Sequence, residues 1–352
     1  MQLPLLYVLF CGQLYGTERM AFATLEGLKD EFQPILLSPP GLALEEGKRR
    51  GFITKSFVNK KELLSHINDY LKNHKKLVFF ATGITHSLIF AALNFWYRRQ
   101  CIHVHMVHGG TDERESYGRK KYLNSLGIVF VANSIFTKTR MIANGVRADK
   151  IKVIENFLFE SKDYPKRSPF TQEKIQRLVV VSRLDPIKRV DLLLDALEKI
   201  PQLGKLSIRV CGSGWDLEKL RTRAQASHPN VNFLGYTDNV PTELANADLL
   251  VHLCPVEPFG IAILEAMAAG IPVLVPDTGG ASALVEEGVS GFHFHAEDVD
   301  DLAKRLLELT QAQPEQLNQV VGSAREALTT RFSSARGLTE YRRLLSIFLA
   351  KI

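Results

Sequence analysis

Short apolar runs alternate with segments of helical spacing along almost the whole chain, and a loop separates each run from the next segment. A chain that repeats strand, loop and helix in this way folds into parallel sheets covered by helices on both faces. The alternation therefore predicts an α/β protein. The predicted strands are Leu5–Phe10, Gln33–Ser38, Leu77–Ala81, His103–Val107, Ile128–Ala132, Ile151–Ile154, Leu178–Val181, Ser207–Cys211, Val231–Leu234, Leu249–Leu253, Pro272–Val275 and Gly291–Phe294. The predicted helices include Glu18–Lys29, Lys61–Asn73, Leu88–Tyr97 and Ile261–Ala269.

A polar segment that contains two prolines, residues 161–174, interrupts the alternation and indicates a linker. A chain of 352 residues is also long for one core and suits two domains. We therefore predict two doubly wound, Rossmann-like domains, over residues 1–165 and 166–337. Because parallel sheets bind ligands at the carboxyl ends of their strands, we expect the site in the cleft between the domains. A helix with an apolar face at about residues 338–352 either caps the second domain or packs back on the first.

The net charge of +6 is distributed unevenly, with +8 on residues 1–165 and −2 on residues 166–352. A basic first half suits anionic partners such as lipid headgroups or phosphates, and it equally suits a solvated surface. Basic and aromatic residues do not interleave, and no basic run is longer than Arg119-Lys120-Lys121. The sequence therefore argues against a nucleic-acid partner.

Several features concern the compartment in which the chain works. The four cysteines are widely spaced and form no paired motif, which indicates reduced thiols. Met1–Phe10 lacks a basic n-region and a cleavage site, which favours a buried strand over a signal peptide. Leu77–Tyr97 is long enough to span a bilayer, but polar residues interrupt it and favour a strand, a turn and a helix. We predict a cytoplasmic protein, and the basic first half is compatible with peripheral contact with an anionic membrane at its inner face.

Two carboxylates flank the start of a predicted helix in the second half. Glu257 precedes the helix Ile261–Ala269, and Glu265 lies inside it. Gly260, at the join, lets the backbone approach a ligand closely. The free N–H groups and the dipole of the helix start attract an anion, whereas the carboxylates suit hydroxyl groups as acceptors. A phosphate between two hydroxyl-rich bodies describes a sugar nucleotide.

Other strand ends in the second half carry further candidates. Arg183 follows strand Leu178–Val181, and Lys188 comes at the start of the helix that follows. Two cations there can neutralise a pyrophosphate leaving group. Alone they would favour a solvated basic loop, but beside the carboxylate motif they favour a site. Gly212, in a Gly-x-Gly after a strand, permits close backbone approach, and a tight turn explains it as well. Tyr236 belongs to a loop suited to hold a nucleotide base.

Together these motifs resemble the retaining glycosyltransferases of family 4, which have the two-domain GT-B fold. The resemblance is strongest over residues 176–295, through the Glu-x7-Glu pattern and the Glu-Ala-Met-Ala-Ala-Gly-Ile-Pro-Val that follows. It implies that Glu265 binds the donor ribose and that Glu257 contacts the donor sugar. It also implies that Arg183 and Lys188 bind the diphosphate. The backbone N–H groups implied near sugar and phosphate are those of Phe259, Gly260 and Ile261.

The first half resembles the family more loosely. Gly16 matches the glycine loop after the first strand, and His108 matches a histidine that faces the reacting sugar and orients it. Three positions depart from the family pattern. Phe157 replaces the glycine of the usual Asn-Gly at the domain junction, and Ala283 replaces the glutamate that follows a Gly-Gly pair. Pro258 replaces the first glycine of the common Glu-Gly-Phe-Gly. Against the family pattern, Ala283 implies that one donor-side contact is missing, and each departure implies a shift in donor preference.

Three histidines, His103, His105 and His108, raise the question of a metal. The acidic residues close to them in sequence are Asp112 and Glu113. The Asp-x-Asp pattern at Asp298 and Asp300 is better explained as a helix N-terminus than as a metal site for a diphosphate. We therefore predict neither a metal nor another cofactor, and a nucleotide-sugar that acts as a substrate.

These observations lead to one predicted function with open alternatives. We predict a metal-independent, retaining hexosyltransferase that moves a sugar from a UDP- or GDP-sugar to a hydroxyl acceptor in polysaccharide, glycolipid or other glycoconjugate synthesis. The alternatives are a GT-B nucleotide-sugar epimerase and a catalytically silent GT-B module in a complex. A phosphorylase is disfavoured because no cofactor-lysine motif is apparent. The departures at Phe157 and Ala283 leave room for the silent module, whereas the retained charged residues argue against it.

Overall fold

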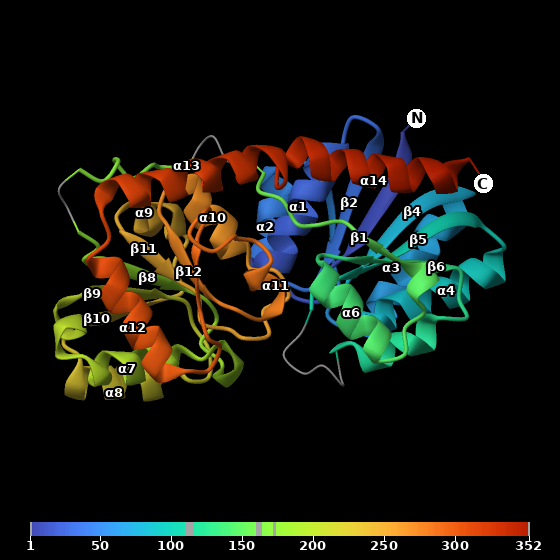
Figure 1. Cartoon of the computed structure of the whole chain (residues 1–352). Coiled ribbons are helices and arrows are strands. Elements are labelled where there is room, and N and C mark those ends of the chain that lie inside the picture. Colours follow the sequence, from blue (N-terminus) through green and yellow to red (C-terminus); the bar gives the residue numbers. More distant parts are fainter. Residues whose placement is uncertain (1, 110–115, 160–163, 172–173, 351–352) are drawn as a thin grey trace. The chain divides into compact units, whose positions relative to one another are not determined.

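The computed structural model of this chain describes residues 2–109, 116–159, 164–171 and 174–350. Figure 1 shows two compact units, each built on its own sheet. The first unit comprises Met1–Phe157 and Ser334–Ile352, and the second comprises Leu158–Ser333. The chain therefore leaves the first unit somewhat before the predicted boundary at residue 165, and it returns to that unit for its last segment.

The first unit contains a sheet of seven parallel strands in the order β3-β2-β1-β4-β5-β6-β7. The strands are β1 (Leu3–Val8), β2 (Phe32–Ser38), β3 (Ile53–Ser56), β4 (Lys76–Ala81), β5 (Gln100–Val107), β6 (Ile128–Ala132) and β7 (Ile151–Val153). The helices are α1 (Gly16–Leu28), α2 (Leu42–Arg49), α3 (Lys60–Asn73), α4 (Ile84–Tyr97), α6 (Ile135–Ala143) and α14 (Ser334–Leu349), with short 3-10 helices η1 (Gly118–Leu123) and η2 (Ala148–Lys150).

Helices cover both faces of this sheet, as two neighbouring phenylalanines of β4 show. Successive side chains of a strand point to opposite faces. Phe79 stacks on Phe90 of α4, with ring centroids 3.9 Å apart. Phe80 contacts Tyr341 of α14, with centroids 6.1 Å apart. The carboxyl-terminal helix α14 therefore packs on the sheet of the first unit, where it also contacts α1.

The second unit contains a sheet of six parallel strands in the order β10-β9-β8-β11-β12-β13. The strands are β8 (Arg177–Val181), β9 (Ser207–Cys211), β10 (Val231–Gly235), β11 (Leu249–Val251), β12 (Val273–Pro276) and β13 (Phe292–Phe294). The helices are α7 (Val190–Lys199), α8 (Leu217–Ser227), α9 (Val240–Ala245), α10 (Ile261–Ala269), α11 (Gly279–Ser282), α12 (Val299–Thr310) and α13 (Pro314–Thr330), with 3-10 helices η4 (Pro186–Lys188) and η5 (Pro201–Lys205).

In both sheets the strand order reverses beside the first strand of the unit. β1 lies between β2 and β4, and β8 lies between β9 and β11. Where the order reverses, the loops at the carboxyl ends of the two adjacent strands leave in opposite directions, and open α/β sheets bind their ligands there. The predicted α/β class with two doubly wound, Rossmann-like units is confirmed.

The segment Leu77–Tyr97, considered above as a span, divides into most of β4 and the helix α4. Within the described part of the chain, no helix is both long enough and apolar enough to cross a bilayer. The division follows from Thr82 and Gly83, which lie between strand and helix. The Thr82 hydroxyl donates a hydrogen bond to the Val8 carbonyl at 3.3 Å, so the turn is held to β1.

Candidate active site

The loop after β8 carries the two predicted cations. Its backbone is fixed by the turn after β9, because Leu184 N donates to the Ser213 carbonyl at 2.9 Å. The 3-10 helix η4 then brings Lys188 inward, and only 13% of its side chain is exposed. Arg183 is more open, and its guanidinium lies 2.7 Å from a carboxylate oxygen of Asp185. The two predicted cations thus share one loop but differ in burial.

The loop after β11 carries Glu257 and is held from the side by the loop after β12. Gly280 N donates to the Glu257 carbonyl at 2.6 Å, and the Thr278 hydroxyl donates to the Pro255 carbonyl at 2.8 Å. A Cβ at Gly280 would lie 2.0 Å from the Pro258 carbonyl oxygen, so only glycine fits. Thr278 is the N-cap of α11 and Gly280 lies in its first turn, so the start of α11 clamps the loop that carries Glu257.

Lys188 and Glu257 meet although 69 residues separate them. Lys188 Nζ lies 2.5 Å from Glu257 Oε2, and both side chains are largely buried. β8 and β11 are adjacent, so the contact lies at the reversal of strand order in this sheet. The pair therefore occupies the position at which an open α/β sheet binds a ligand.

A third side chain completes this cluster. His252, directly after β11, is 5% exposed, and its Nε2 lies 3.5 Å from Glu257 Oε2. Burial alone would raise the pKa of Glu257, but Lys188 and His252 outweigh burial and hold that pKa far below its usual value. Burial alone would lower the pKa of Lys188, but the charge of Glu257 outweighs burial and raises that pKa above its usual value. Both members of the pair are therefore ionised at neutral pH.

The helix α10 begins beside this pair. Its N-cap Gly260 has φ of +97°, a left-handed conformation that disfavours any side chain. Phe259, Gly260 and Ile261 thus form the turn from which the helix starts, as predicted. Glu265, one turn into the helix, is 4% exposed and accepts a hydrogen bond from the Tyr164 hydroxyl at 3.0 Å. A buried glutamate with a hydroxyl partner matches an acceptor for hydroxyl groups.

The remaining second-unit candidates lie at the ends of β9 and β10. Gly212 has φ of +143°, and a Cβ there would lie 1.8 Å from the Ser182 carbonyl oxygen. Packing of the backbone against the loop after β8 therefore accounts for the glycine without a ligand. Tyr236 directly follows β10 and is 41% exposed, so its ring is available to a base. Gly212 and Tyr236 directly follow the adjacent strands β9 and β10, which lie on the same side of β8 in the sheet.

In the first unit, Gly16 and His108 lie at the carboxyl ends of β1 and β5. Gly16 is the first residue of α1, and the buried Glu18 accepts a hydrogen bond from Tyr15 N at 3.1 Å. Burial raises the pKa of Glu18 to about 7. Both ring nitrogens of His108 are buried and have no hydrogen-bond partner among the described residues. Burial, followed by the charge of Lys120, lowers the pKa of His108 to about 4, so this imidazole is neutral.

A serine links the other two histidines of β5. The Ser87 hydroxyl lies 2.8 Å from His105 Nδ1 and 3.0 Å from His103 Nε2. The hydroxyl has a single proton to donate, so at most one of the two nitrogens accepts from it and at least one donates to it. Burial lowers the pKa of His103 to about 3 and that of His105 well below its ordinary value, so both imidazoles are uncharged.

The metal question raised by these histidines has a structural answer for part of the chain. Within the residues that the structure describes, no three His, Cys, Asp or Glu side chains come together in a way that could hold a metal ion. Asp112 and Glu113, the acidic neighbours in sequence, and Gly110 beside His108 lie outside the described residues. The predicted independence from metal stays a prediction.

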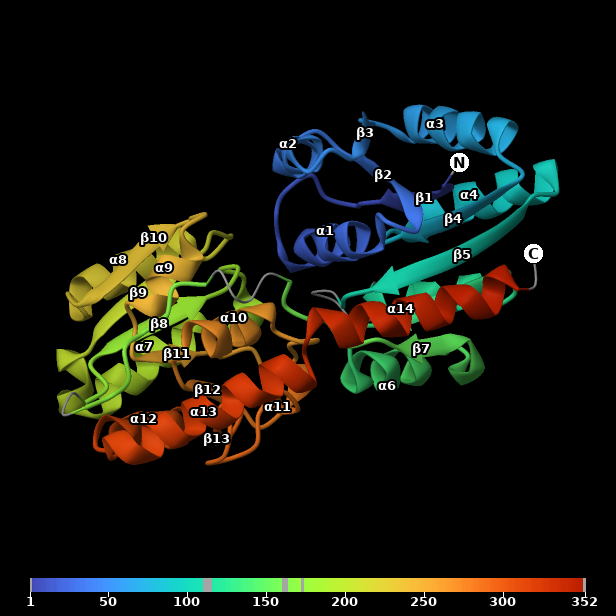
Figure 2. The same ribbon diagram turned by 90° about the horizontal axis from the view of Figure 1, so that it is seen from above.

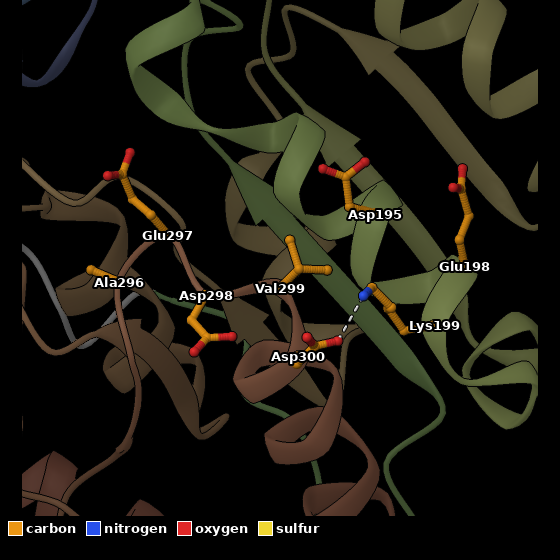
Figure 3. Close-up of a pocket in the computed structure, with 8 residues that line it drawn as sticks. All are labelled: Asp195, Glu198, Lys199, Ala296, Glu297, Asp298, Val299 and Asp300. Atoms are coloured by element: carbon orange, nitrogen blue, oxygen red, sulfur yellow. Dashed lines mark ion pairs between the residues drawn. The ribbon is translucent and has the colours of Figure 1, made fainter.

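A separate hollow of the second unit is drawn in Figure 3. It is lined by carboxylates of α7, of the loop after β13 and of the start of α12, and Lys199 pairs with Asp300 at 2.8 Å. Acidic side chains outnumber the single lysine and would repel a diphosphate. The residues that line it are Asp195, Glu198, Lys199, Ala296, Glu297, Asp298, Val299 and Asp300, and none of them is a predicted site residue.

Three residues of these clusters were not predicted from the sequence: His252, Tyr164 and Ser87. His252 lies in an apolar run where a histidine gives no local signal. Tyr164 lies in the polar segment predicted as a linker. Its aromatic ring beside Pro165 is the one feature of the sequence that could have drawn attention to it. The signal for Ser87 was its spacing of 16 and 18 residues from two histidines, which becomes a contact only through the sheet.

Comparisons with known proteins agree with this geometry. Residues 162–327, just under half of the chain, match the sequence model of the family "Glycosyl transferases group 1". The N-acetyl-alpha-D-glucosaminyl L-malate synthase of Bacillus anthracis is 28% identical over 61% of this chain, which covers 58% of that enzyme. A GDP-mannose-dependent alpha-(1-6)-phosphatidylinositol monomannoside mannosyltransferase of Mycobacterium tuberculosis is 36% identical over 38% of this chain, and 37% of that enzyme is covered. The matches thus cover only about a third to three fifths of these curated relatives.

Solved structures extend the likeness over nearly the whole chain. Anabaena HepE (Alr3699), in a crystal structure with UDP and glucose, superposes with a TM-score of 0.85 over 98% of this chain and all of that one, at 22% identity. A sucrose-phosphate synthase of Thermosynechococcus elongatus superposes with a TM-score of 0.79 over the full length of both chains, at 14% identity. At these identities the likeness concerns the fold, which is that of GT-B glycosyltransferases.

Proposed function

We propose that this chain, whose residues 162–327 belong to the group 1 glycosyl transferases, transfers a sugar from a nucleotide-sugar to an acceptor hydroxyl with retention of anomeric configuration. The observation that carries the proposal is the contact between Lys188 and Glu257 at the reversal of strand order in the second unit. A buried lysine and the amino end of α10 on one side of the sheet suit a diphosphate. Buried carboxylates on either side of that helix start suit the hydroxyls of two sugars.

The proposed roles follow the charges. Glu265 accepts hydrogen bonds from the donor ribose, in place of the Tyr164 hydroxyl that it accepts from now. Glu257 holds hydroxyls of the transferred sugar. Lys188 and Arg183 face the diphosphate, where they stabilise negative charge that develops as the donor breaks. The donor is a UDP- or GDP-sugar, in line with the GDP-mannose-dependent relative and the UDP-bound HepE structure described above.

The proposed reaction transfers one glycosyl group. The bond between the anomeric carbon and the diphosphate oxygen breaks, and the acceptor oxygen forms the new bond to that carbon on the same face. The acceptor proton goes to an oxygen of the leaving diphosphate. Lys188 stays protonated, and its pKa is raised by Glu257, so it acts through its charge. His108, held neutral by burial, orients the sugar and does not remove the acceptor proton. No metal enters this scheme, and metal independence is part of the proposal.

A donor panel tests the proposal. Slow hydrolysis of UDP-, GDP- and ADP-sugars is measured by release of the nucleoside diphosphate, with and without EDTA. We expect hydrolysis of one donor, unaffected by EDTA, and a loss of at least about a hundredfold in Lys188→Ala and in Arg183→Ala. Lys199→Ala is the matched control, because Lys199 also pairs with a carboxylate but is half exposed and lies in the acidic hollow.

Each other outcome points elsewhere. Unchanged hydrolysis in both Lys188→Ala and Arg183→Ala would show that leaving-group stabilisation is misassigned. Interconversion of two nucleotide-sugars would indicate an epimerase. Tight binding of a donor without hydrolysis, and without transfer to any hydroxyl acceptor, would favour a catalytically silent module.

A further inference from the structure

The helix α4 of the first unit presents an apolar face to solvent. Leu88, Ala92, Phe95 and Trp96 are exposed, and the exposed fractions of Phe95 and Trp96 are 85% and 79%. Their spacing of four, seven and eight residues from Leu88 places them on one side of the helix. A helix on the surface of a globular protein normally turns charged residues outward here. The fourteen residues of α4 contain no charged side chain at all.

Cations gather at the carboxyl-terminal end of this face. Arg98 and Arg99 follow α4 directly, and Arg99 Nε donates to the Leu71 carbonyl of α3 at 2.8 Å. The ends of α3 and α4 therefore lie together, as the packing of the two helices on one face of the sheet requires (Figure 2). Lys76 pairs with Gln100 in the sheet, so the start of β4 joins the same edge.

We call this surface the α4 patch. Its apolar part consists of Leu88, Ala92, Phe95 and Trp96, and its cationic rim consists of Lys72, Lys75, Lys76, Arg98 and Arg99. Lys72, Lys75, Lys76 and Arg98 are exposed. Asp69, one turn before the end of α3, is the acidic residue closest to the rim in sequence, so five positive charges stand against one negative charge.

We propose that the α4 patch docks the protein on the surface of an anionic phospholipid bilayer. Exposed Trp and Phe side chains insert at the level of the headgroups, where an amphipathic ring is most stable. Lysines and arginines beside them lie within reach of the lipid phosphates and are attracted by the negative surface potential. The patch offers both signals together, and one alone would give only weak, reversible binding.

Charge and size disfavour a second copy of the chain as the occupant. A two-fold contact through this face would bring two cationic rims against each other. The four apolar side chains are also few for a stable interface, which needs roughly 800 Å² on each partner. A bilayer supplies the opposite charge and imposes no minimum area.

Co-sedimentation of the full chain with vesicles tests the proposal. The vesicles contain either phosphatidylcholine alone or phosphatidylcholine with phosphatidylglycerol, at low and at high salt. We expect binding to the anionic vesicles at low salt and its loss at high salt, because salt screens the rim. The double variant Phe95→Ser/Trp96→Ser should weaken binding by roughly tenfold or more, and Lys72→Gln/Lys75→Gln/Lys76→Gln by roughly fivefold for each lysine. Trp215→Ser, at an 88% exposed tryptophan of the second unit, is the matched control and should bind as the parent does.

Fluorescence gives a second readout, because Trp96 and Trp215 are the only tryptophans of the chain. In Trp215→Phe the remaining Trp96 should shift to the blue with anionic vesicles and should be quenched by lipids brominated on the acyl chain. In Trp96→Phe the remaining Trp215 should show neither effect. Both measurements need no donor or acceptor, so their result is independent of sugar transfer.

Three results would overturn the proposal. The first is equal sedimentation of the parent and Phe95→Ser/Trp96→Ser with anionic vesicles. The second is the absence of parent binding at low salt. The third is a concentration-dependent dimer, detected by analytical ultracentrifugation, that Phe95→Ser/Trp96→Ser abolishes while vesicle binding is absent. That result would assign the α4 patch to a second copy.

Discussion

In the second unit Lys188 is buried against Glu257, whereas in the first unit His103 and His105 are buried against a serine. Burial disfavours charge in both places, but the outcome differs. In the second unit an opposite charge compensates it, and both partners stay ionised. In the first unit nothing compensates it, and the imidazoles become neutral.

The difference matters for what each strand end can bind. A lysine whose present partner is a carboxylate can exchange that partner for a phosphate without a change in its own charge. Neutral imidazoles offer one donor and one acceptor each, which suits sugar hydroxyls and repels no ion. The two units therefore offer different chemistry, with charged groups in the second unit and neutral imidazoles in the first. Four predictions test this contrast.

The largest effect concerns acid. A histidine whose pKa falls on folding stabilises the fold above its unfolded pKa near 6.5, and that contribution is lost as the pH falls toward the folded value. Burial lowers the pKa of His103 to about 3 and that of His86, a buried histidine of α4, to about 4. Each would withdraw about 3 to 5 kcal/mol between pH 6.5 and its folded pKa. Glu257, whose pKa is lowered, withdraws its contribution only below its usual pKa near 4.5. We therefore expect the first unit to open first on acidification.

Hydrogen exchange detected by mass spectrometry at pH 7.5 and pH 5 measures this order. Amides of β5 should lose protection at pH 5, after correction for intrinsic exchange, while amides of β11 keep theirs. His103→Phe, which keeps an aromatic ring against Phe79 and Phe90, should remove part of the loss. Equal loss in β5 and β11 would contradict the contrast between the units.

The second prediction breaks the charged pair. Lys188→Met leaves the Glu257 carboxylate buried without its cation, and we expect a loss of about 3 to 5 kcal/mol in the free energy of unfolding of the second unit. Lys188→Met/Glu257→Gln removes both charges and should recover most of that stability, but no donor hydrolysis. Denaturation curves of the two variants and of Glu257→Gln form a double-mutant cycle. Additive effects in that cycle would mean that the two side chains do not interact.

The third prediction concerns Glu18, a buried acid in the first turn of α1. Its pKa is raised from 4.5 to about 7, so the folded state binds more protons between these values, and stability falls as the pH rises. The difference corresponds to about 3 kcal/mol at pH 8. Glu18→Gln should be more stable than the parent at pH 8 by up to that amount and equal to it near pH 4. Urea titrations at several pH values measure the difference.

A matched control has the opposite sign. Arg49, and then Arg50, lower the pKa of Glu46 in the same unit against the effect of burial, so Glu46→Gln should lose stability above pH 5 and not gain it. Parallel pH profiles of the parent and Glu18→Gln would show that Glu18 keeps its charge when buried.

Much of the fold could be predicted because its strands are continuous apolar runs, which parallel sheets require. The predicted strands did not include β3, and the predicted helices did not include α2 among others. β3 is an edge strand of four residues with two exposed positions, so it carries no apolar run. α2 is a helix of eight residues after Gly41, too short to show a helical period. The predicted strand Leu249–Leu253 ends at Val251, and His252, directly after it, contacts Glu257.

The site was predicted in part for a related reason. Lys188 and Glu257 were each found by residue type at a strand end, since loops at carboxyl ends of parallel strands share one edge. Their direct contact could not be predicted, because it depends on β11 being placed beside β8 rather than beside β10. The clamp formed by Gly280 was missed because its close contact with the Pro258 carbonyl joins two loops that sequence cannot align.

The smallest expected effect concerns Ser87, on which the neutral histidines depend. Ser87→Ala leaves His103 Nε2 and His105 Nδ1 buried without a partner, and we expect a loss of about 1 to 3 kcal/mol. Ser65→Ala, at an exposed serine of α3, should change stability by less than about 0.5 kcal/mol. Nitrogen NMR of the imidazoles gives a sharper readout, because each neutral imidazole should carry one proton and at least one of the two nitrogens that contact Ser87 should be protonated. If either imidazole carried protons on both of its nitrogens in the parent at neutral pH, that ring would be charged, and the contrast between a neutral first unit and an ionised second unit would need revision.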